Sequence, residues 1–317
     1  MSIIEQTRTA AVPLKFFDPK ITADGSARAS VDLRALETLW INTGTLCNLT
    51  CARCYIESSP TNDRLTYISR AEVGAYLDEI RDLGLATREI GLTGGEPFMN
   101  PDVIDILDDT LSRGFEALVL TNAMTPLKHH RDALLGLHER FGSALTLRVS
   151  LDHYTEERHE EERGPFSWAR TIDGLQWLAK NGFSLAVAGR SLWHEDESAT
   201  RAGYAKLFSE LDISVNAHDA GRLVIFPEMD EAAVVPEITT ACWNILSVRP
   251  DAMMCATSRM VVKRKGAARP AVVACTLLPY DTQFEIGDTL ADADKSVHLN
   301  HPHCASFCVL GGGSCSA

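Results

Sequence analysis

Three cysteines, Cys47, Cys51 and Cys54, stand close together in a C-x3-C-x2-C spacing. Cysteine thiolates hold iron–sulfur clusters, and a [4Fe–4S] cube usually takes four of them. Three thiolates on one loop would hold three irons and leave the fourth iron open to a cofactor or substrate. A zinc knuckle and a set of buried free thiols stay open as alternatives. Zinc sites usually take their ligands as two separated pairs, which this triplet does not form.

A second group of chemically useful residues lies in the stretch LTGGEPFMNPD, which starts at Leu92. Gly94 and Gly95 permit tight backbone approach, and Glu96 supplies one carboxylate. A free backbone edge and a carboxylate suit an ammonium group. Taken alone, the stretch equally predicts an ordinary strand-to-helix turn in which Pro97 fixes the exit of the chain.

Together, the cysteine triplet and the GGE stretch one βα unit later resemble the radical S-adenosylmethionine (SAM) superfamily. The resemblance implies that the three cysteines bind a [4Fe–4S] cluster, that SAM chelates the open iron, and that the GGE stretch contacts the methionine amino group. One electron would then cleave SAM to a 5′-deoxyadenosyl radical, which abstracts hydrogen from a substrate. A flavodoxin- or ferredoxin-type protein is the expected electron donor.

Other family motifs are matched in part. In VLTNAM, Ala123 replaces the glycine of the family's TNG, and Arg53 stands where many members carry an aromatic residue before the third cysteine. Arg170 lies where relatives place an arginine for the SAM carboxylate, because a guanidinium can bind a carboxylate bidentately; an exposed helix arginine is the alternative. The candidate SAM contacts beyond the GGE stretch are Tyr55, Thr121, Asn122, Ser150, Arg170 and Arg190.

Candidate substrate-facing residues follow the fourth and fifth predicted strands. Asp152 and Tyr154 begin the charged stretch DHYTEERHEEERG, and His194 lies in GRSLWHEDE. Loops at strand ends present chemistry in barrels of parallel strands. For the charged stretch, a solvated helix or loop face is the alternative interpretation.

The six remaining cysteines all lie in the last quarter of the chain. Gly266 separates two apolar segments, 260–263 and 271–275, which predicts a β-hairpin with a cysteine near each end. This region resembles the SPASM and twitch extensions of radical SAM enzymes, which hold auxiliary [4Fe–4S] clusters, although its C-x3-C-x6-C run departs from the fuller SPASM pattern. A zinc site is the competing interpretation. The preferred auxiliary ligands are Cys255, Cys275, Cys304 and Cys308, with Cys315 as the substitute.

Alternating strand and helix patterns must position these residues, and they predict an α/β fold with a parallel sheet. Strands are expected at 37–42, 89–92, 117–120, 145–150, 185–188 and within 213–226. Helices are expected at 69–83, 102–113, 126–140, 167–180 and 200–211. The resemblance implies a partial (β/α)6 TIM-like radical SAM barrel followed by a small cysteine-rich β-hairpin auxiliary-cluster domain. The predicted divisions are an N-terminal arm at 1–32, the barrel at 33–230 and the auxiliary domain at 231–317.

The composition of the chain argues against some classes of binding partner. The chain has 317 residues, a formal net charge of -13 and nine cysteines. An acidic surface argues against a nucleic-acid partner, since phosphate binding needs a basic face. The sequence has no apolar run of membrane-spanning length and no signal-peptide pattern, which predicts a cytoplasmic protein with no membrane partner.

These observations predict a radical SAM enzyme that abstracts hydrogen from a small-molecule or natural-product substrate, with an auxiliary cluster aiding oxidation or binding. The arm at 1–32 is too short for the peptide-binding domain of many peptide-modifying relatives, which favours the small molecule. A peptide- or protein-modifying maturase is the first alternative. A non-catalytic iron–sulfur electron carrier and an RNA-modifying enzyme are alternatives of other classes.

Overall fold

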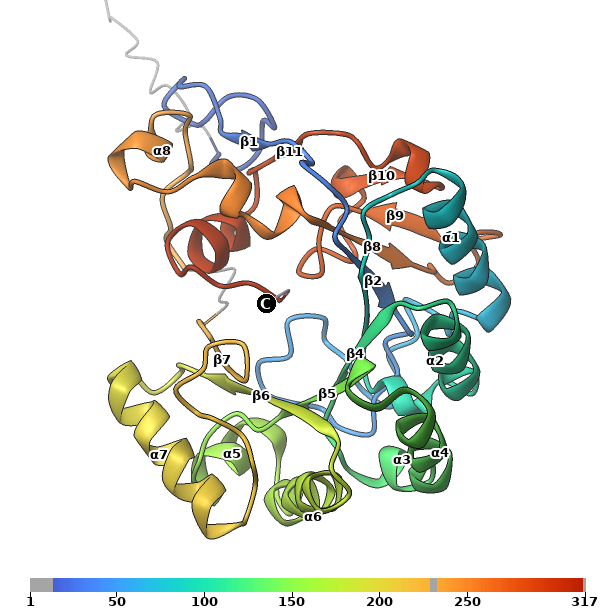
Figure 1. The fold of residues 1–317 in the computed structure, drawn as a ribbon. Helices are drawn as coiled ribbons and strands as arrows, with labels where there is room; N and C mark the ends of the chain where they lie inside the picture. Colours follow the sequence, from blue (N-terminus) through green and yellow to red (C-terminus); the bar gives the residue numbers. More distant parts are fainter. Residues whose placement is uncertain (1–13, 229–232, 316–317) are drawn as a thin grey trace, which may run out of the picture.

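The computed structural model describes residues 14–228 and 233–315 (Figure 1). The first thirteen residues of the predicted arm therefore lie outside the described residues. Within the described ranges, no helix combines the length and the apolar character that a membrane span requires.

A nine-stranded sheet runs through the molecule in the order β10-β9-β8-β2-β3-β4-β5-β6-β7. Strands β2 to β7 are all parallel to their neighbours, which confirms the predicted α/β fold with six parallel strands. Their bounds are β2 Thr38–Asn42, β3 Glu89–Thr93, β4 Glu116–Thr121, β5 Leu145–Ser150, β6 Ser184–Arg190 and β7 Leu223–Phe226.

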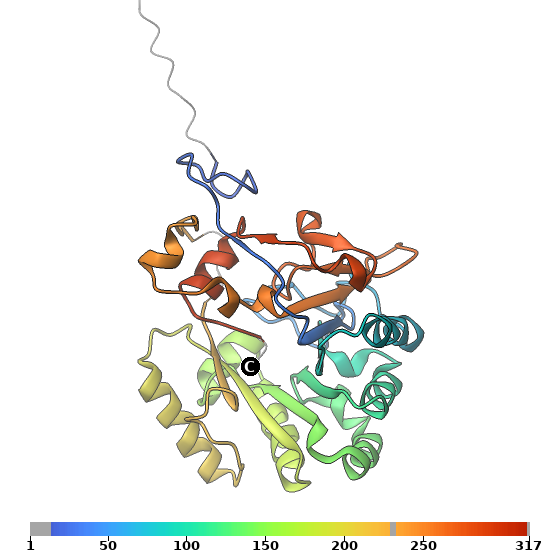
Figure 2. The same ribbon diagram turned by 45° about the horizontal axis from the view of Figure 1, so that its top comes forward.

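Helices connect these strands and cover the outer face of the curved sheet (Figures 1 and 2). The outer helices are α1 Arg70–Asp82, α2 Val103–Ser112, α3 Thr125–Lys128, α4 Arg131–Phe141, α5 Glu156–Arg163, α6 Ser167–Lys180 and α7 Glu197–Glu210. Ser69 caps α1 as predicted, and it forms a capping box with Glu72.

Alternation along the strands divides the apolar residues between two faces. In β2, Leu39 and Ile41 pack with the helices, whereas Trp40 packs on the inner face with residues of the C-terminal region. Successive strand side chains point to opposite faces, so one buried strand serves two cores. The inner face is thereby left for the tail and the functional site.

The expected helix at 126–140 is divided in two. Helix α3 ends at Lys128 and α4 begins at Arg131. Between them, the Nε2 atom of His130 lies 3.2 Å from the carbonyl oxygen of Phe98, and the two rings are in contact. This non-local contact fixes the break, which helical periodicity cannot reveal.

The C-terminal region extends the same sheet. Strand β8 (Ser258–Val262) pairs parallel to β2, and β9 (Ala271–Val273) turns back antiparallel, which confirms the predicted hairpin. Strand β10 (Glu285–Gly287) follows at the edge. Strand β8 thus continues the sheet of the barrel. The domain boundary expected at residue 230 stays a prediction. The short elements are α8 Cys242–Ile245, the 3-10 turns Pro97–Met99, Gly142–Ala144, Pro250–Ala252, Met254–Ala256, Thr282–Phe284 and Leu290–Asp292, and the π-helix Cys304–Val309.

The described part of the arm packs against the C-terminal region. Strand β1 (Ser30–Val31) pairs with β11 (Val297–His298). Arg28 and Glu237 form an ion pair at 2.5 Å, and both side chains are nearly inaccessible to solvent. The segment 28–31 and the C-terminal region therefore stabilise each other on one side of the barrel (Figure 1).

Gly91 provides a direct test of the inner core. A Cβ at this position in β3 would lie 2.4 Å from the buried Trp40 ring. We expect Gly91→Ala to lower the free energy of unfolding by about 1–3 kcal/mol through overpacking. Gly136→Ala, in α4, is the matched control: nothing lies within 4 Å of its added Cβ, and it should stabilise by about 0.5–1 kcal/mol. Urea unfolding measures both, and equal midpoints for the two variants would contradict the packing.

Candidate active site

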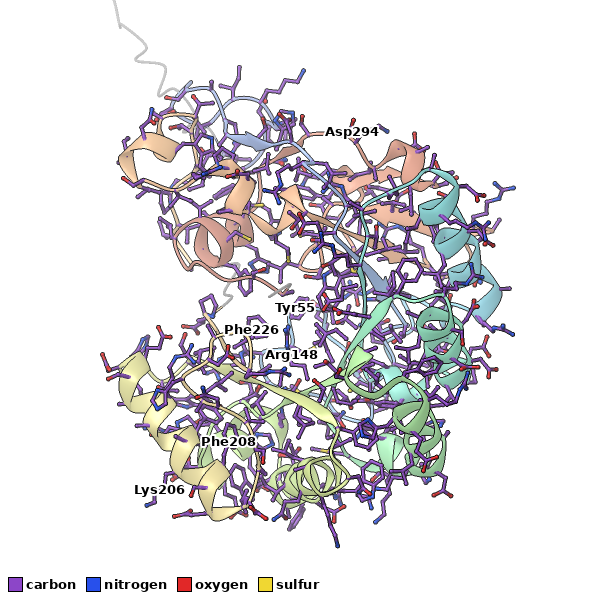
Figure 3. All side chains as sticks on the ribbon, in the orientation of Figure 1. Tyr55, Arg148, Lys206, Phe208, Phe226 and Asp294 are labelled. Atoms are coloured by element: carbon purple, nitrogen blue, oxygen red, sulfur yellow. The ribbon has the colours of Figure 1, made fainter. Side chains whose placement is uncertain are left out.

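A cavity opens at the carboxyl ends of the parallel strands, where the cysteine loop, the strand ends and the tail meet. With its mouth included, it measures about 1060 Å³. Tyr55, Arg148 and Phe226 lie toward the middle of the ring of elements, whereas Lys206 and Asp294 lie at its periphery (Figure 3). The residues that line the cavity include Cys47, Cys51, Cys54, Tyr55, Gly94, Gly95, Thr121, Asn122, Ser150, Asp152, Glu162, Arg163, Arg190, Phe226, Leu277, Phe307 and Cys315.

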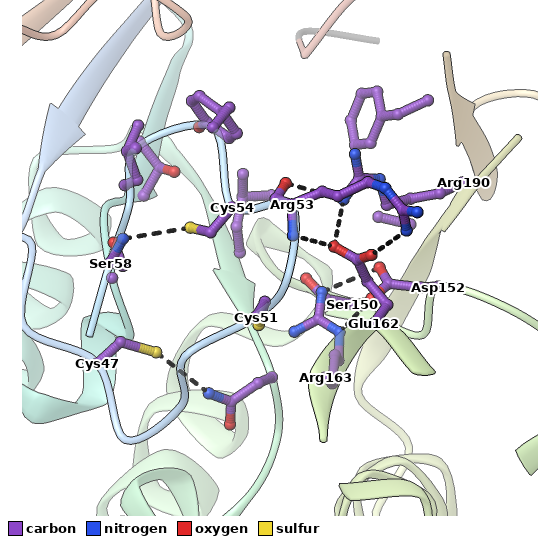
Figure 4. A pocket seen from close by; sticks show the side chains of 18 of the residues that line it. Cys47, Cys51, Arg53, Cys54, Ser58, Ser150, Asp152, Glu162, Arg163 and Arg190 are labelled. Carbon is purple, nitrogen blue, oxygen red and sulfur yellow. Dashed lines mark hydrogen bonds and ion pairs between the residues drawn. The ribbon is translucent and has the colours of Figure 1, made fainter. Parts of the chain in front are cut away.

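The loop between β2 and α1 brings all three predicted cluster cysteines to this cavity (Figure 4). The Cys47 sulfur accepts a hydrogen bond from the Leu49 amide at 3.4 Å, and the Cys54 sulfur accepts one from the Ser58 amide at 3.3 Å. Burial raises the pKa of Cys47 to about 12 and so favours the protonated thiol.

Three thiols on one loop are the ligands that a cluster with one open iron would take. Within residues 14–228 and 233–315, no three His, Cys, Asp or Glu side chains are placed to hold one metal ion. A [4Fe–4S] cube binds each thiolate through a different iron, so its ligands stand apart around it. Amide donors to the sulfurs, as at Cys47 and Cys54, also tune the reduction potential of such clusters.

The glycine pair lets the end of β3 touch the backbone of the cysteine loop. The Gly95 amide donates to the Gly44 carbonyl at 2.8 Å. A Cβ on Gly95 would lie 2.1 Å from the Leu46 carbonyl oxygen, and one on Gly94, whose φ is +136°, would lie 2.4 Å from that of Gly44. Both positions therefore require glycine, because the backbone of the cysteine loop packs directly against this edge of the chain.

Glu96 lies behind this edge and does not line the cavity. Its carboxylate accepts hydrogen bonds from the Thr121 hydroxyl at 2.9 Å and the Asn122 amide at 2.8 Å, which join the ends of β3 and β4. Burial raises its pKa to about 7, although these donors act in the opposite direction. The Asn122 side chain in turn donates to Asn48, next to Cys47, at 2.9 Å.

An ion pair missed by the sequence prediction forms one wall. Arg163, the last residue of α5, donates to both carboxylate oxygens of Asp152 at 2.6 and 3.0 Å. Burial opposes ionisation of Asp152, but the charge and hydrogen bonds of Arg163 outweigh it and lower the pKa of the carboxyl. The only sequence signal was an arginine directly before the helix-ending Gly164, within a stretch interpreted as solvated.

Arg190, at the end of β6, leaves one donor group available. Its Nη1 atom donates to the Glu162 carboxylate at 2.9 Å and to the Arg53 carbonyl at 3.1 Å. Its Nη2 atom is buried and has no hydrogen-bond partner among the described residues. A buried guanidinium without a full set of acceptors fits an anionic group such as a ligand carboxylate.

Besides Glu96, three residues predicted to contact SAM or substrate lie outside the cavity. Arg170 is exposed on α6, and His194 is exposed in the loop after β6. The Tyr154 hydroxyl donates to Glu195 at 3.3 Å, and its ring packs against Gly203. None of the three lines the cavity, whereas Tyr55, Thr121, Asn122, Ser150, Asp152 and Arg190 do.

Five of the tail thiols share one buried region. Cys255, Cys275, Cys304 and Cys308 lie together in the second apolar core, where burial raises the pKa of each and neighbouring thiols add to the effect for the last three. Cys315 belongs to the same core, next to Cys275 and Cys308, and it also lines the central cavity. Its carbonyl accepts from the buried Arg148 at 2.7 Å, and its sulfur accepts from the Thr276 hydroxyl at 3.2 Å. The chain thus crosses back into the barrel at its C-terminal end.

Residues 41–194 of the chain match the family model of the radical SAM superfamily. Enzymes of this family use a [4Fe–4S] cluster and SAM.

Individual relatives extend the match. The chain is 29% identical over 301 residues to the antilisterial bacteriocin subtilosin biosynthesis protein AlbA of Bacillus subtilis, covering 89% of this chain and 62% of AlbA. It is 29% identical over 163 residues to the mycofactocin maturase MftC of Mycobacterium tuberculosis, covering 49% of this chain and 39% of MftC. The chain therefore spans about three fifths of the length of AlbA and about two fifths of the length of MftC.

The fold resembles that of SuiB from Streptococcus suis bound to S-adenosylmethionine. The TM-score is 0.58 at 13% sequence identity, and the match covers 80% of this chain and 63% of SuiB. This likeness supports the partial barrel followed by a further C-terminal region.

The two arginines Arg163 and Arg170 allow a paired test of the site. Arg163→Ala leaves the buried Asp152 carboxylate without its partner, and breaking such a pair should cost about 3 kcal/mol of unfolding free energy. Arg170→Ala removes an exposed side chain from α6 and should change stability by less than about 0.5 kcal/mol. Urea unfolding of the cluster-free proteins measures both. Equal losses would mean that the ion pair is not formed in solution.

Proposed function

We propose that this protein is a radical SAM enzyme that modifies a peptide. The observation that carries the proposal is that three loop thiols, a glycine backbone edge and an incompletely bonded guanidinium all line one cavity. In this proposal Cys47, Cys51 and Cys54 hold the cluster. The proposed SAM contacts are Gly94, Gly95, Thr121, Asn122, Ser150 and Arg190, with Tyr55 beside them.

Bound together, the cluster and SAM supply a 5′-deoxyadenosyl radical for hydrogen abstraction. The chain contributes orientation and exclusion of water. Arg190 supplies a donor for a carboxylate, and the edge at Gly94 and Gly95 supplies backbone groups for an ammonium. Phe226 and Phe307 pack with ring centroids 5.7 Å apart and form an apolar wall that keeps water away from the reacting centre.

We further propose an auxiliary [4Fe–4S] cluster in the tail. Cys255, Cys275, Cys304 and Cys308 supply the four thiols that a cube takes, and they share one buried region. Cys315 is the substitute ligand, and its place on the cavity wall would bring an auxiliary cluster close to the substrate. A flavodoxin- or ferredoxin-type donor of electrons remains part of the proposal.

A peptide substrate is favoured over the small molecule that the short arm suggested. AlbA, which is named for bacteriocin biosynthesis, matches 89% of this chain. The GTP 3′,8-cyclase of Erythrobacter litoralis, which is named for a small molecule, matches only 32% of it. Of these two relatives, the one that matches more of the chain is therefore the one named for a bacteriocin. SuiB has been solved with its precursor peptide SuiA.

Anaerobic reconstitution tests the radical chemistry. We expect about eight irons per chain, falling to about four when Cys47, Cys51 and Cys54 are all changed to Ala, because one of two cubes is lost. With dithionite and SAM, only the wild type should release 5′-deoxyadenosine. A wild type that binds iron but never cleaves SAM would show an electron carrier instead. About four irons with zinc in the tail would leave the barrel chemistry intact and remove the auxiliary cluster.

The substrate class requires a separate test. Short peptides encoded beside the gene are the probes, and GTP is the small-molecule comparison. We expect a peptide, and not GTP, to increase 5′-deoxyadenosine release and to change in mass after incubation. The triple cysteine variant is the control. A mass change in GTP, with none in any peptide, would return the proposal to a small-molecule substrate.

A further inference from the structure

Only two residues, Ala52 and Arg53, separate the cysteines Cys51 and Cys54. Such a short connection moves both thiols whenever its backbone moves. The connection rests on the end of α5, an eight-residue helix inserted between β5 and α6 (Figure 4). What holds these two residues therefore determines how well the loop presents its thiols.

Glu162 of α5 holds this connection at three points. Its carbonyl accepts the Ala52 amide at 2.8 Å. Its carboxylate accepts the Arg53 amide at 2.8 Å and the Arg53 guanidinium at 3.0 Å. One residue of a neighbouring helix thus fixes both amides and the only charged side chain between the two thiols.

Arg190 completes the arrangement from the other side. It donates to the Glu162 carboxylate at 2.9 Å and to the Arg53 carbonyl at 3.1 Å. The Glu162 side chain is 1% exposed, and its partners Arg53 and Arg190 are 45% and 12% exposed. A carboxylate this buried needs such partners, because an unpaired buried charge is costly.

Charge beside an iron–sulfur cluster sets its reduction potential, as do hydrogen bonds and exposure. A carboxylate near the cluster disfavours the added electron and lowers the potential. An arginine at the same place raises it. Glu162 and Arg53 therefore act on the cluster in opposite senses while they hold the same backbone.

We propose that Glu162 is a positioning residue for the radical SAM cluster, acting through the two residues between Cys51 and Cys54 and through its charge. The inference rests on the proposed function only in taking Cys47, Cys51 and Cys54 as the cluster ligands. Glu162 contacts neither SAM nor substrate in this role.

The test compares the reconstituted full chain with Glu162→Gln, which keeps the shape and removes the charge. Glu157→Gln, an exposed position on the same helix, is the matched control. The first readout is the rate at which the loop cluster loses iron to EDTA. We expect Glu162→Gln to lose it about tenfold faster, the usual scale for removing a partner that orients metal ligands, and Glu157→Gln to match the wild type. Equal rates in all three proteins would overturn the proposal.

The second readout is the reduction potential, followed by EPR; the loop signal is the one absent from the triple cysteine variant. Glu162→Gln should raise the potential, and Arg53→Gln, which removes a positive charge at a partly exposed position, should lower it. Arg53→Gln also keeps the test available if Glu162→Gln fails to fold. Shifts of the same sign, or none, would show that charge has no part and would overturn the proposal.

The experiments can disprove the proposed function and the role of Glu162 independently of each other. A wild type that assembles the loop cluster but cleaves no SAM removes the proposed function, while the iron-release and potential measurements still decide the role of Glu162. A wild type that cleaves SAM, with Glu162→Gln indistinguishable from it in both readouts, removes the role of Glu162 alone.

Discussion

The whole site depends on a close backbone contact between the end of β3 and the loop that follows β2. The Gly95 amide reaches the Gly44 carbonyl, and the Glu96 amide reaches that of Leu46. Because no side chain intervenes, the cysteine loop folds back over the carboxyl edge of the sheet instead of extending into solvent. The parallel register of β2 with β3 fixes the two partners of this contact. The sheet therefore determines where the thiols lie.

The two halves of the cavity differ in chemistry because different parts of the chain build them. The barrel supplies paired ions, in which three guanidinium groups, those of Arg53, Arg163 and Arg190, face the carboxylates of Asp152 and Glu162. The tail and the last strand supply aromatic and aliphatic groups. Ion pairs in a poorly solvated wall stay rigid, since separating them exposes unpaired buried charge. The ionic half thus holds a fixed geometry, and the apolar half excludes water.

Sequence patterns predicted the strands closely, since period-two alternation and glycine stops are local signals. They also predicted the three cavity thiols and the glycine edge. The predictions failed where contacts between distant parts of the chain determine which residues are buried. The stretch that forms α5 looked solvated, yet His159 and Glu162 are buried, because other segments cover them. Arg163 lines the cavity and Arg170 does not, which depends on the placement of α5 and α6 rather than on spacing. Cys315 reaches the cavity only because the tail returns across the barrel.

The position of β2 has a consequence for how the chain folds. Strand β2 lies between β3 and β8, and its Thr38 pairs with Ser258, which is far away along the sequence. All five residues of β2 are buried in the finished sheet. During synthesis, one edge of this apolar strand stays open until β8 has emerged, and open apolar edges invite pairing with other chains. Such long-range pairing also slows folding, since a large loop must close before the contact forms. This side of the sheet is therefore completed late, by a strand from outside the βα repeats.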